Sequence, residues 1–296
     1  MKNNNIRRLV VILFFFSLSL IHAQESVNFV TYGPNSNPKE GDNDFIQVFF
    51  LEVDDPSVDS ISVELFDADC SGENDQSFGL KFNSEFKFSL LGGSSCYTAE
   101  TIKTEYPTNT DLYKGTLLKS LFASNQTEFD NKWTHFATIK KSEGEFFNGK
   151  YYFKFIIDGI SGDDANVFNI RATSKNNKAI KIFNYAPTIH LLSKMSPIQL
   201  RFNSADNNQI IINNYDADNA RISWKSPYRE VELKKPSGDG EWKNESVEIK
   251  TFEKNEICAI QFGPGGKKNN DAIFYITNEN GKNIPIELPI KSIIKN

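Results

Sequence analysis

The chain is poor in the residue types that build many catalytic and metal sites. It has three histidines and three cysteines among 296 residues, and one of the histidines, His22, lies in the apolar N-terminal segment. Zinc sites use histidine and cysteine ligands, and serine or cysteine nucleophiles are commonly activated by a histidine base. Because only His135 and His190 follow the N-terminal segment, we expect neither zinc chemistry nor nucleophilic catalysis.

The signature motifs of several enzyme classes are also missing. The sequence contains no G-x-S-x-G, H-E-x-x-H, G-x-G-x-x-G or phosphate-binding P-loop pattern. We therefore predict that the protein is not an enzyme. A glycosidase needs only two carboxylates at a suitable separation, so a secreted β-sandwich hydrolase acting on polysaccharide stays an alternative.

Long hydrophobic runs are absent apart from one, Leu9–Ile21, which follows Lys2, Arg7 and Arg8. This run of about 13 residues is too short for a membrane-spanning helix, which needs roughly 20, and it ends near the small residue Ala23. The pattern predicts a cleavable signal peptide over residues 1–23, with no membrane span after its removal. We expect an exported protein that is periplasmic, on the cell surface or extracellular.

Positive charge is in deficit, because 33 Lys and Arg face 38 Asp and Glu. Removal of the leader takes away three more basic residues. An acidic surface gives no electrostatic attraction to nucleic acid, so we expect no nucleic-acid partner. Glycans and envelope proteins stay open as partners, and the sequence leaves the oligomeric state open.

Alternation of apolar and polar residues with period two dominates the chain and predicts strands. The clearest examples are "FIQVFFLEV", "ISVELF" and "YYFKFII" before residue 174, and "IQLRF", "ARISW" and "AIFYIT" after residue 197. No alternation of strands and helices appears. We predict an all-β fold with two tandem β-sandwich domains of jelly-roll type, residues 24–174 and 198–296, joined by a linker over residues 175–197.

The segment "DADCSGENDQ", residues 67–76, matches the opening of a calcium loop. Asp67, Asp69 and Ser71 occupy its first three ligand positions and Gly72 its turn position, but Phe78 stands where the loop needs a bidentate glutamate. Oxygen donors at this density favour calcium over zinc. Asp75 is a further candidate ligand, and the missing one is expected from Asp163 and Asp164 in "SGDDAN", or from Asp42 and Asp44 in "EGDND".

A related segment, "YDADNARIS", occurs in the second half of the chain and suggests a duplication. Its Asp216 and Asp218 are weaker candidates for a second calcium site. Solvated acidic turns are the alternative interpretation of all these segments.

Two of the cysteines lie close together in the sequence. In an exported protein we predict that Cys70 and Cys96 form a disulfide and that Cys258, within "EICAIQF", is a buried free thiol. The bond would close a loop that includes most of the acidic segment.

Aromatic residues beside polar turns are the candidates for ligand binding, because a rigid ring can stack on a sugar while neighbouring polar groups orient it. Trp242 in "GDGEWKNES" is the first choice and Tyr228 the second, with Asp239 and Glu241 as hydrogen-bond partners. Trp224 closes an alternating strand and is expected in the core.

The first half also resembles a known family. "DFIQVFFLEV", "ISVELFDAD", "FSLLGG" and "EFFNGKYYFKFIIDGISGDDANVFNIRA" follow the strand pattern of jelly-roll modules of secreted bacterial proteins, of the pre-peptidase C-terminal and galactose-binding-like type. Gly149, Tyr151 and Gly159 hold places comparable to that family's late G-x-Y-x-x-x-V-x-G strand. The resemblance covers about residues 45–173 and implies structural calcium and carbohydrate binding.

Together these observations predict an exported, non-catalytic binding or adhesion protein of the bacterial envelope, with structural calcium and a possible carbohydrate ligand. A secreted hydrolase and a structural envelope protein with a protein partner are the alternatives.

Overall fold

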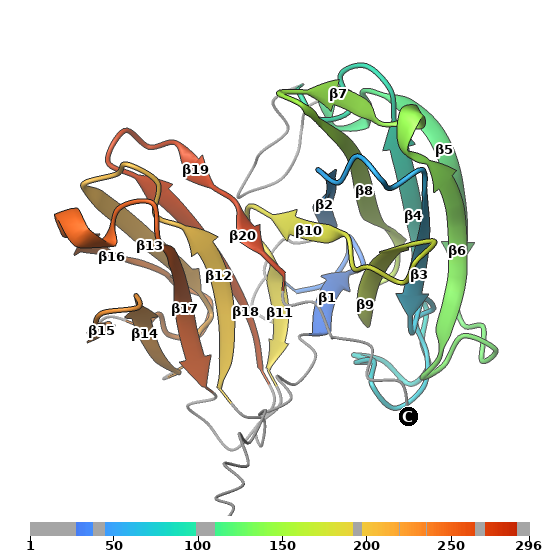
Figure 1. Cartoon of the computed structure of the whole chain (residues 1–296). Helices are drawn as coiled ribbons and strands as arrows, with labels where there is room; N and C mark the ends of the chain where they lie inside the picture. The colour runs from blue at the N-terminus through green and yellow to red at the C-terminus, as the bar shows by residue number, and fades with distance from the viewer. Residues whose placement is uncertain are drawn as a thin grey trace, which may run out of the picture.

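The computed structural model of the chain describes residues 28–37, 45–98, 110–191, 197–218, 220–234, 236–263 and 270–288. In these residues the protein is all-β, with two large antiparallel sheets packed face to face (Figure 1). Helical structure there is limited to three short 3₁₀ segments, η1 (Thr110–Tyr113), η2 (Lys141–Glu143) and η3 (Thr251–Glu253). No helix in the described part of the chain is long and apolar enough to cross a bilayer. The predicted all-β sandwich is confirmed, whereas the predicted signal peptide lies outside the described residues.

Sheet A, the first of the two sheets, has the strand order β16-β13-β18-β11-β1-β9-β3-β6, with β19 paired to β18. In chain order its strands are β1 (Asn28–Tyr32), β3 (Ser60–Phe66), β6 (Trp133–Lys140), β9 (Ala165–Ser174), β11 (Thr188–Leu191), β13 (Gln209–Tyr215), β16 (Trp242–Glu248), β18 (Asn270–Asn278) and β19 (Asn283–Ile284).

Sheet B has the order β15-β14-β17-β12-β20-β10-β2-β8-β4-β5, with β7 paired to β8. Its strands are β2 (Ile46–Val53), β4 (Glu85–Gly92), β5 (Thr116–Ala123), β7 (Glu145–Phe147), β8 (Lys150–Ser161), β10 (Lys181–Asn184), β12 (Ile198–Asn203), β14 (Arg221–Lys225), β15 (Glu230–Glu232), β17 (Ile257–Gly263) and β20 (Ile286–Glu287).

The strand order of the second half repeats that of the first. In sheet A, β1-β9-β3-β6 corresponds to β11-β18-β13-β16, and in sheet B, β10-β2-β8-β4-β5 corresponds to β20-β12-β17-β14-β15. We call β1 to β10 the first half and β11 to β20 the second half. The two Asp-Ala-Asp segments occupy equivalent places in this repeated topology, directly after β3 and β13.

Corresponding strands also join the two halves. β1 pairs antiparallel with β11, with Phe29 opposite Ile189, and β10 pairs antiparallel with β20, with Phe183 opposite Glu287. Each junction brings together two equivalent strands in opposite directions, which is the relation that a local two-fold axis produces. Both sheets therefore continue without a break from one half into the other.

The apolar core follows from the alternation seen in the sequence. β3 reads Ser-Ile-Ser-Val-Glu-Leu-Phe, and its Ile61, Val63 and Leu65 are fully buried between the sheets. One contiguous cluster of buried side chains extends from Phe168 in the first half to Phe274 in the second. The core is thus shared by the two halves.

A buried polar network crosses the junction on the outer face of sheet A. Asp271 of β18 accepts hydrogen bonds from the Tyr32 hydroxyl and from Gln76 Nε2 (2.9 Å), and its Oδ1 lies 2.6 Å from Nδ1 of His190. His190 and Asp271 are each only 4 % exposed. Tyr32 and Gln76 belong to the first half and the other two residues to the second, so the network ties the halves together.

The segment 175–197, predicted to be a linker, contains two strands of the sheets. β10 pairs with β2 and β20, and β11 pairs with β1 and β18. The segment therefore contributes hydrogen bonds to both halves. The division into two domains stays a prediction, but the boundary is not a free connector.

Because both sheets and the core are shared, we expect the two halves to unfold together. Tryptophan fluorescence can follow each half, since Trp133 lies in the first and Trp224 and Trp242 lie in the second. In urea, Trp133→Phe and the double variant Trp224→Phe/Trp242→Phe should give coincident transitions. Two separated midpoints, with one half melting while the other keeps its signal, would show that the halves are independent.

Candidate metal centre

Three carboxylates meet at one end of the first half. Asp67 and Asp69 follow β3, and Asp130 lies in the loop between β5 and β6. β3 and β6 are paired with Phe66 opposite Trp133, so the end of one strand lies beside the start of the other. One ligand oxygen from each of the three aspartates lies within 4.8 Å of the others. In the described part of the chain, this is the one such group of acidic, histidine or cysteine residues.

Local backbone geometry makes this approach possible. Asp67 has φ of 55°, in the left-handed region that aspartate tolerates better than most residues. Gly72 has φ of 85°, and a Cβ at this position would lie 3.2 Å from Cγ of Asp130. Glycine is needed at Gly72 both for its backbone conformation and for the close approach of Asp130.

The hydrogen bonds of the group are incomplete. Asp67 accepts from Asn74 Nδ2 (2.7 Å) and from the Asn131 amide (3.1 Å), so both its oxygens have partners. Asp69 Oδ2 accepts from the Gln126 amide (3.0 Å) and from Ser71 Oγ, whereas its Oδ1 is buried with no donor. A buried carboxylate oxygen without a donor is rare in native proteins and calls for an explanation.

Ser71 adds to the shortage of donors. Its Oγ contacts both Asp69 Oδ2 and Asp130 Oδ1, the latter at 2.7 Å. A hydroxyl has one proton, so it can donate to only one of these two oxygens at a time. The other contact then brings two oxygens together with no proton between them. This contact is favourable only if one carboxyl is protonated or if a cation binds both oxygens.

Two further buried oxygens beside the group have no donor either. They are Gln126 Oε1 and Asn166 Oδ1. The backbone of Gln126 bonds to Asp69, and Asn166 Nδ2 donates to the carbonyl of Ala68 at 3.4 Å. Both residues thus bond to the segment 67–69 and carry a buried amide oxygen that lacks a hydrogen bond. Carboxylate and amide oxygens are the ligands that hard divalent cations prefer.

Electrostatics point the same way. Burial, followed by the nearby carboxylates of Asp130 and Asp67, raises the pKa of Asp69 to about 6. Burial also raises the pKa of Asp67, against the opposing hydrogen bonds from Asn74 and Asn131. Like charges held this close favour the protonated form, and a bound cation would remove that preference.

The other predicted ligands hold the surrounding loop in place. Asp75 accepts from the amides of Ser71 (2.7 Å) and Val167 (2.6 Å), so each of its oxygens has a backbone donor. Burial raises its pKa to about 9. Its role is to brace the turn that carries Ser71 against β9.

Among the described residues, the third carboxylate of the group comes from Asp130 and not from Asp163 or Asp164. Asp164 accepts from the amides of Asn83 (2.5 Å) and Ser84 (3.1 Å), and Asp163 accepts from Asn83 Nδ2 (2.7 Å). These two aspartates fasten the end of the β3–β4 loop. Asp42 and Asp44 lie outside the described residues.

The second half contains a counterpart of this site. Asp216 follows β13 with φ of 48°, and Gly240 donates to its Oδ1 at 3.0 Å, as Asn131 donates to Asp67 Oδ1 at 3.1 Å. Asp130 lies three residues before Trp133, and Asp239 lies three residues before Trp242. Burial, and then the charges of Asp218 and Asp239, raise the pKa of Asp216 to about 7.

This repeated pattern is the sequence signal that identifies Asp130. In each half, a Phe/Tyr-Asp-Ala-Asp segment stands at the end of one strand, and an Asp-x-x-Trp segment leads into the strand paired with it. Only in the first half are three carboxylates brought within 4.8 Å, as far as the described residues extend.

The predicted disulfide is not formed, because all three cysteines are free and buried. Cys70 precedes β4 and packs in the main core, whereas Cys96 follows β4 and packs on Leu91 and Ile156. The amide of Cys70 donates to the carbonyl of Ser124, beside the start of β4 where Phe86 pairs with Ala123, whereas Cys96 follows the other end of β4. Eight residues of strand span roughly 25 Å at the usual rise per residue. The expectation that Cys258 is a buried free thiol is confirmed.

The predicted ligand-binding residues lie in two places. Trp242 begins β16 and packs on Tyr215 (5.1 Å between ring centroids) and Tyr275 (5.4 Å). Asp239 and Glu241 lie in the turn before it, and Glu241 forms an ion pair with Lys243 (3.2 Å).

Tyr228 is in the turn between β14 and β15, on sheet B. It packs on Phe252 and is 57 % exposed. It therefore belongs to a different surface from Trp242, and the two do not form one site. Trp224, expected in the core, is fully buried there.

A comparison with known protein families and a comparison with curated proteins each find no match to this chain. The function is therefore argued from the residues and their arrangement. The resemblance to secreted jelly-roll modules stays a prediction.

In the presence of a chelator, we expect the carboxylate group to make stability fall as pH rises. The folded protein binds the Asp69 proton more tightly than the unfolded chain does, so the folded state loses relative stability between pH 3.8, the ordinary pKa, and about 6. Asp69→Asn should flatten this slope, with an effect on the order of 1 kcal/mol in the free energy of unfolding. Urea titrations at several pH values measure it.

The exposed Asp59 provides a matched control in the same half. Asp59→Asn should leave the slope unchanged. An equal slope in Asp69→Asn and the parent would contradict the electrostatic account of the group.

Proposed function

We propose that this protein is an exported, non-catalytic binding or adhesion protein of the bacterial envelope, whose first half is stabilised by a bound calcium ion. The observation that carries the proposal is the carboxylate group of Asp67, Asp69 and Asp130, with its buried unpartnered oxygens. It lies in loops at one end of the sandwich and joins the β3–β4 loop to the β5–β6 loop. A cation in this position would order these two loops.

The donor set favours calcium over other cations. All candidate ligand atoms are oxygens, from the three carboxylates and from the side chains of Gln126 and Asn166. Calcium accepts six to eight oxygen ligands in flexible geometry, whereas magnesium demands a tight octahedron and retains several waters. Cys70 lies within the loop, but burial raises the pKa of its thiol, so it does not compete as a thiolate ligand.

Carbohydrate binding is supported by the outer face of sheet A. Trp242, Tyr215 and Tyr275 form an aromatic cluster there, and Trp242 keeps part of its ring accessible. The corresponding tryptophan of the first half, Trp133, has the guanidinium of Arg171 over its ring at 4.1 Å. One face of the first-half ring is therefore occupied by a cation, whereas Trp242 of the second half packs on two tyrosines.

The hydrolase alternative has less support from the described residues. His190 and Asp271, a pair that could act as base and orienting acid, are buried in the junction and bonded to Tyr32 and Gln76. The carboxyls with raised pKa near the metal group, Asp69 and Asp75, are enclosed by their own loop. Neither arrangement offers a substrate direct access. A structural envelope role with a protein partner is the remaining alternative.

If calcium binds this group, it should raise the unfolding temperature of the whole chain, because it binds only the folded state. Calcium at about 100 times its dissociation constant adds roughly 2.7 kcal/mol, which corresponds to several degrees for a chain of this size. Asp130→Asn should abolish most of this shift. Differential scanning calorimetry in calcium and in chelator measures both.

Asp163→Asn is the matched control for this experiment, since Asp163 is an acidic loop residue of the same half outside the group. It should keep the full calcium shift. A shift of the same size in Asp130→Asn and the parent would eliminate this site.

If the aromatic cluster binds a saccharide, Trp242→Ala should weaken binding about tenfold or more, because a stacked ring contributes roughly 1 to 3 kcal/mol of contact energy. A glycan array followed by titration calorimetry on the best ligand measures it. Trp133→Phe should leave the affinity unchanged, since the guanidinium of Arg171 occupies one face of that ring. Release of shorter sugars from any glycan during the assay would instead favour the hydrolase.

A further inference from the structure

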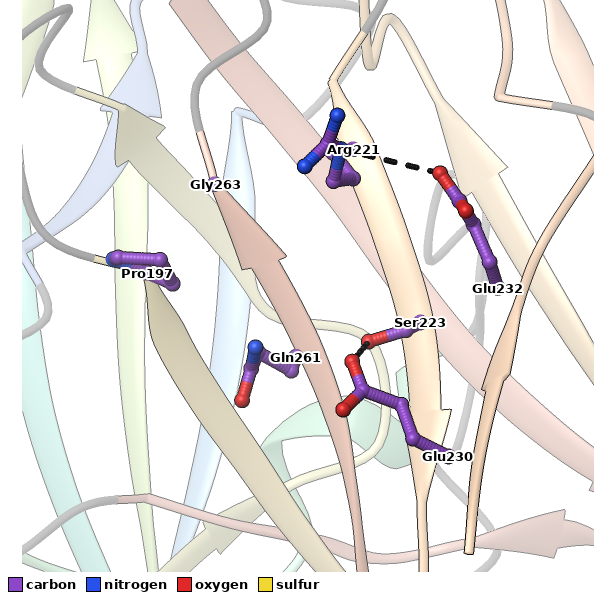
Figure 2. A pocket seen from close by; sticks show the side chains of 7 residues that line it. All are labelled: Pro197, Arg221, Ser223, Glu230, Glu232, Gln261 and Gly263. Carbon is purple, nitrogen blue, oxygen red and sulfur yellow. Dashed lines mark hydrogen bonds and ion pairs between the residues drawn. The ribbon is translucent and has the colours of Figure 1, made fainter.

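A polar groove opens on the outer face of sheet B in the second half (Figure 2). Its volume is about 320 Å³. The residues that line it come from the start of β12, from β14, from β15 and from β17: Pro197, Arg221, Ser223, Glu230, Glu232, Gln261 and Gly263. Gln261, Ser223 and Glu232 lie side by side on three neighbouring strands.

The same row of the sheet is covered in the first half. On β8 and β4, the strands equivalent to β17 and β14, the paired residues Ile156 and Ser89 lie on the same outer face as the paired residues Gln261 and Ser223. Ile156 and Ser89 are almost fully buried, and Leu112 and Cys96 from the connection between β4 and β5 pack on Ile156. The first half thus uses this face for internal packing.

The second half leaves the face open because its connection is short. β14 and β15 are joined by the tight turn 226–229, which cannot reach across the sheet. Where the first half has the buried Ile156 and Ser89, the second half has Gln261 and Ser223 beside charged neighbours. The equivalent face is thus a packing surface in one half and an accessible polar one in the other.

The groove side chains are held in place by one another. Ser223 Oγ donates to Glu230 Oε1 (2.6 Å), and Gln199 Nε2 donates to Gln261 Oε1 (3.0 Å). Arg221 Nε lies 3.7 Å from Glu232 Oε1. These contacts leave Gln261 Nε2 and the second oxygen of Glu230 without a hydrogen-bond partner in the described residues. A donor on β17 and an acceptor on β15 are therefore presented on either side of β14, on strands roughly 10 Å apart.

The chemistry of the lining selects the class of ligand. Arg221 is balanced by Glu232, and Glu230 adds a negative charge, so the groove has no excess positive charge to hold a phosphate or carboxylate. Pro197 is its one apolar side chain, so it lacks the apolar pockets that hold peptide side chains. A neutral ligand with many hydroxyls, each able to donate and accept, matches the amide, carboxylate, hydroxyl and guanidinium groups.

We propose that this groove binds a short neutral saccharide, with Gln261 as donor, Glu230 as acceptor and Arg221 as a further donor at the rim. The ligand class rests on the proposed function, but the site is separate from the Trp242 cluster, which lies on the other sheet. With few apolar contacts, the groove gives weak binding, suited to a polymer that engages many copies of the protein at once.

The test uses the full mature chain and five neutral probes: cellotetraose, laminaritetraose, xylotetraose, mannotetraose and triacetylchitotriose. At least one of them should shift the side-chain amide signal of Gln261 in ¹⁵N-resolved NMR. Gln261→Met should lower the affinity for that probe about tenfold, the loss expected for a hydrogen bond from a positioned group. Gln209→Met, which changes a partly exposed glutamine on sheet A, should leave the affinity unchanged.

Variants at the two sites separate this inference from the proposed function. Loss of binding in Gln261→Met with retention in Trp242→Ala assigns the saccharide to the groove and removes it from the aromatic cluster. Loss in Trp242→Ala with retention in Gln261→Met overturns the groove. Absence of any Gln261 amide shift with all five probes overturns it too, as does a shift produced by the neutral peptide Gly-Ser-Ala-Asn and by none of the saccharides. Circular dichroism and the urea midpoint confirm that each variant is folded.

Discussion

The antiparallel pairing of equivalent strands, β1 with β11 and β10 with β20, is the contact on which the rest of the structure depends. It extends each sheet through the whole chain and places the buried side chains of both halves in one core. Without it, β1 and β11 would each expose an unpaired edge in the middle of sheet A, and such edges favour aggregation. The buried network around Asp271 specifies one register for this pairing, since a slip of one residue would turn His190 to the opposite face.

The two equivalent Asp-Ala-Asp turns, after β3 and after β13, show how one topology can serve different purposes. After β3, the Asp-Ala-Asp turn closes around Asp130 and leaves buried oxygens without donors. After β13, the corresponding turn has the same backbone bonds to its neighbouring loop, but its carboxylates are less tightly gathered. The outer faces of the two sheets also differ between the halves, because Arg171 lies over the ring of one tryptophan and residues of the β4–β5 connection pack on one half of sheet B.

The sequence predicted the strands and two of the three carboxylates of the acidic group, for reasons that are local. Alternation in "ISVELF" defines β3, and the two-residue spacing of Asp67 and Asp69 places both beside one ion. Asp130 was missed because its position depends on the pairing of Phe66 with Trp133, a non-local register that alternation does not determine. The predicted Cys70–Cys96 disulfide is wrong because the two cysteines, although close in sequence, lie at opposite ends of β4. β10 and β11 fall within the predicted linker because "KIFN" and "TIHL" are too short to show the two-residue alternation of apolar and polar side chains.

The local two-fold relation between the halves has an evolutionary consequence. In a symmetric dimer of identical chains, every substitution appears twice, so a change that opens one face opens its counterpart as well. Fusion into a single chain removes that constraint, and each copy of a turn or a sheet face can then diverge alone. The long connection between β4 and β5 in one half and the short turn 226–229 in the other are an asymmetry that the two identical chains of a dimer could not have.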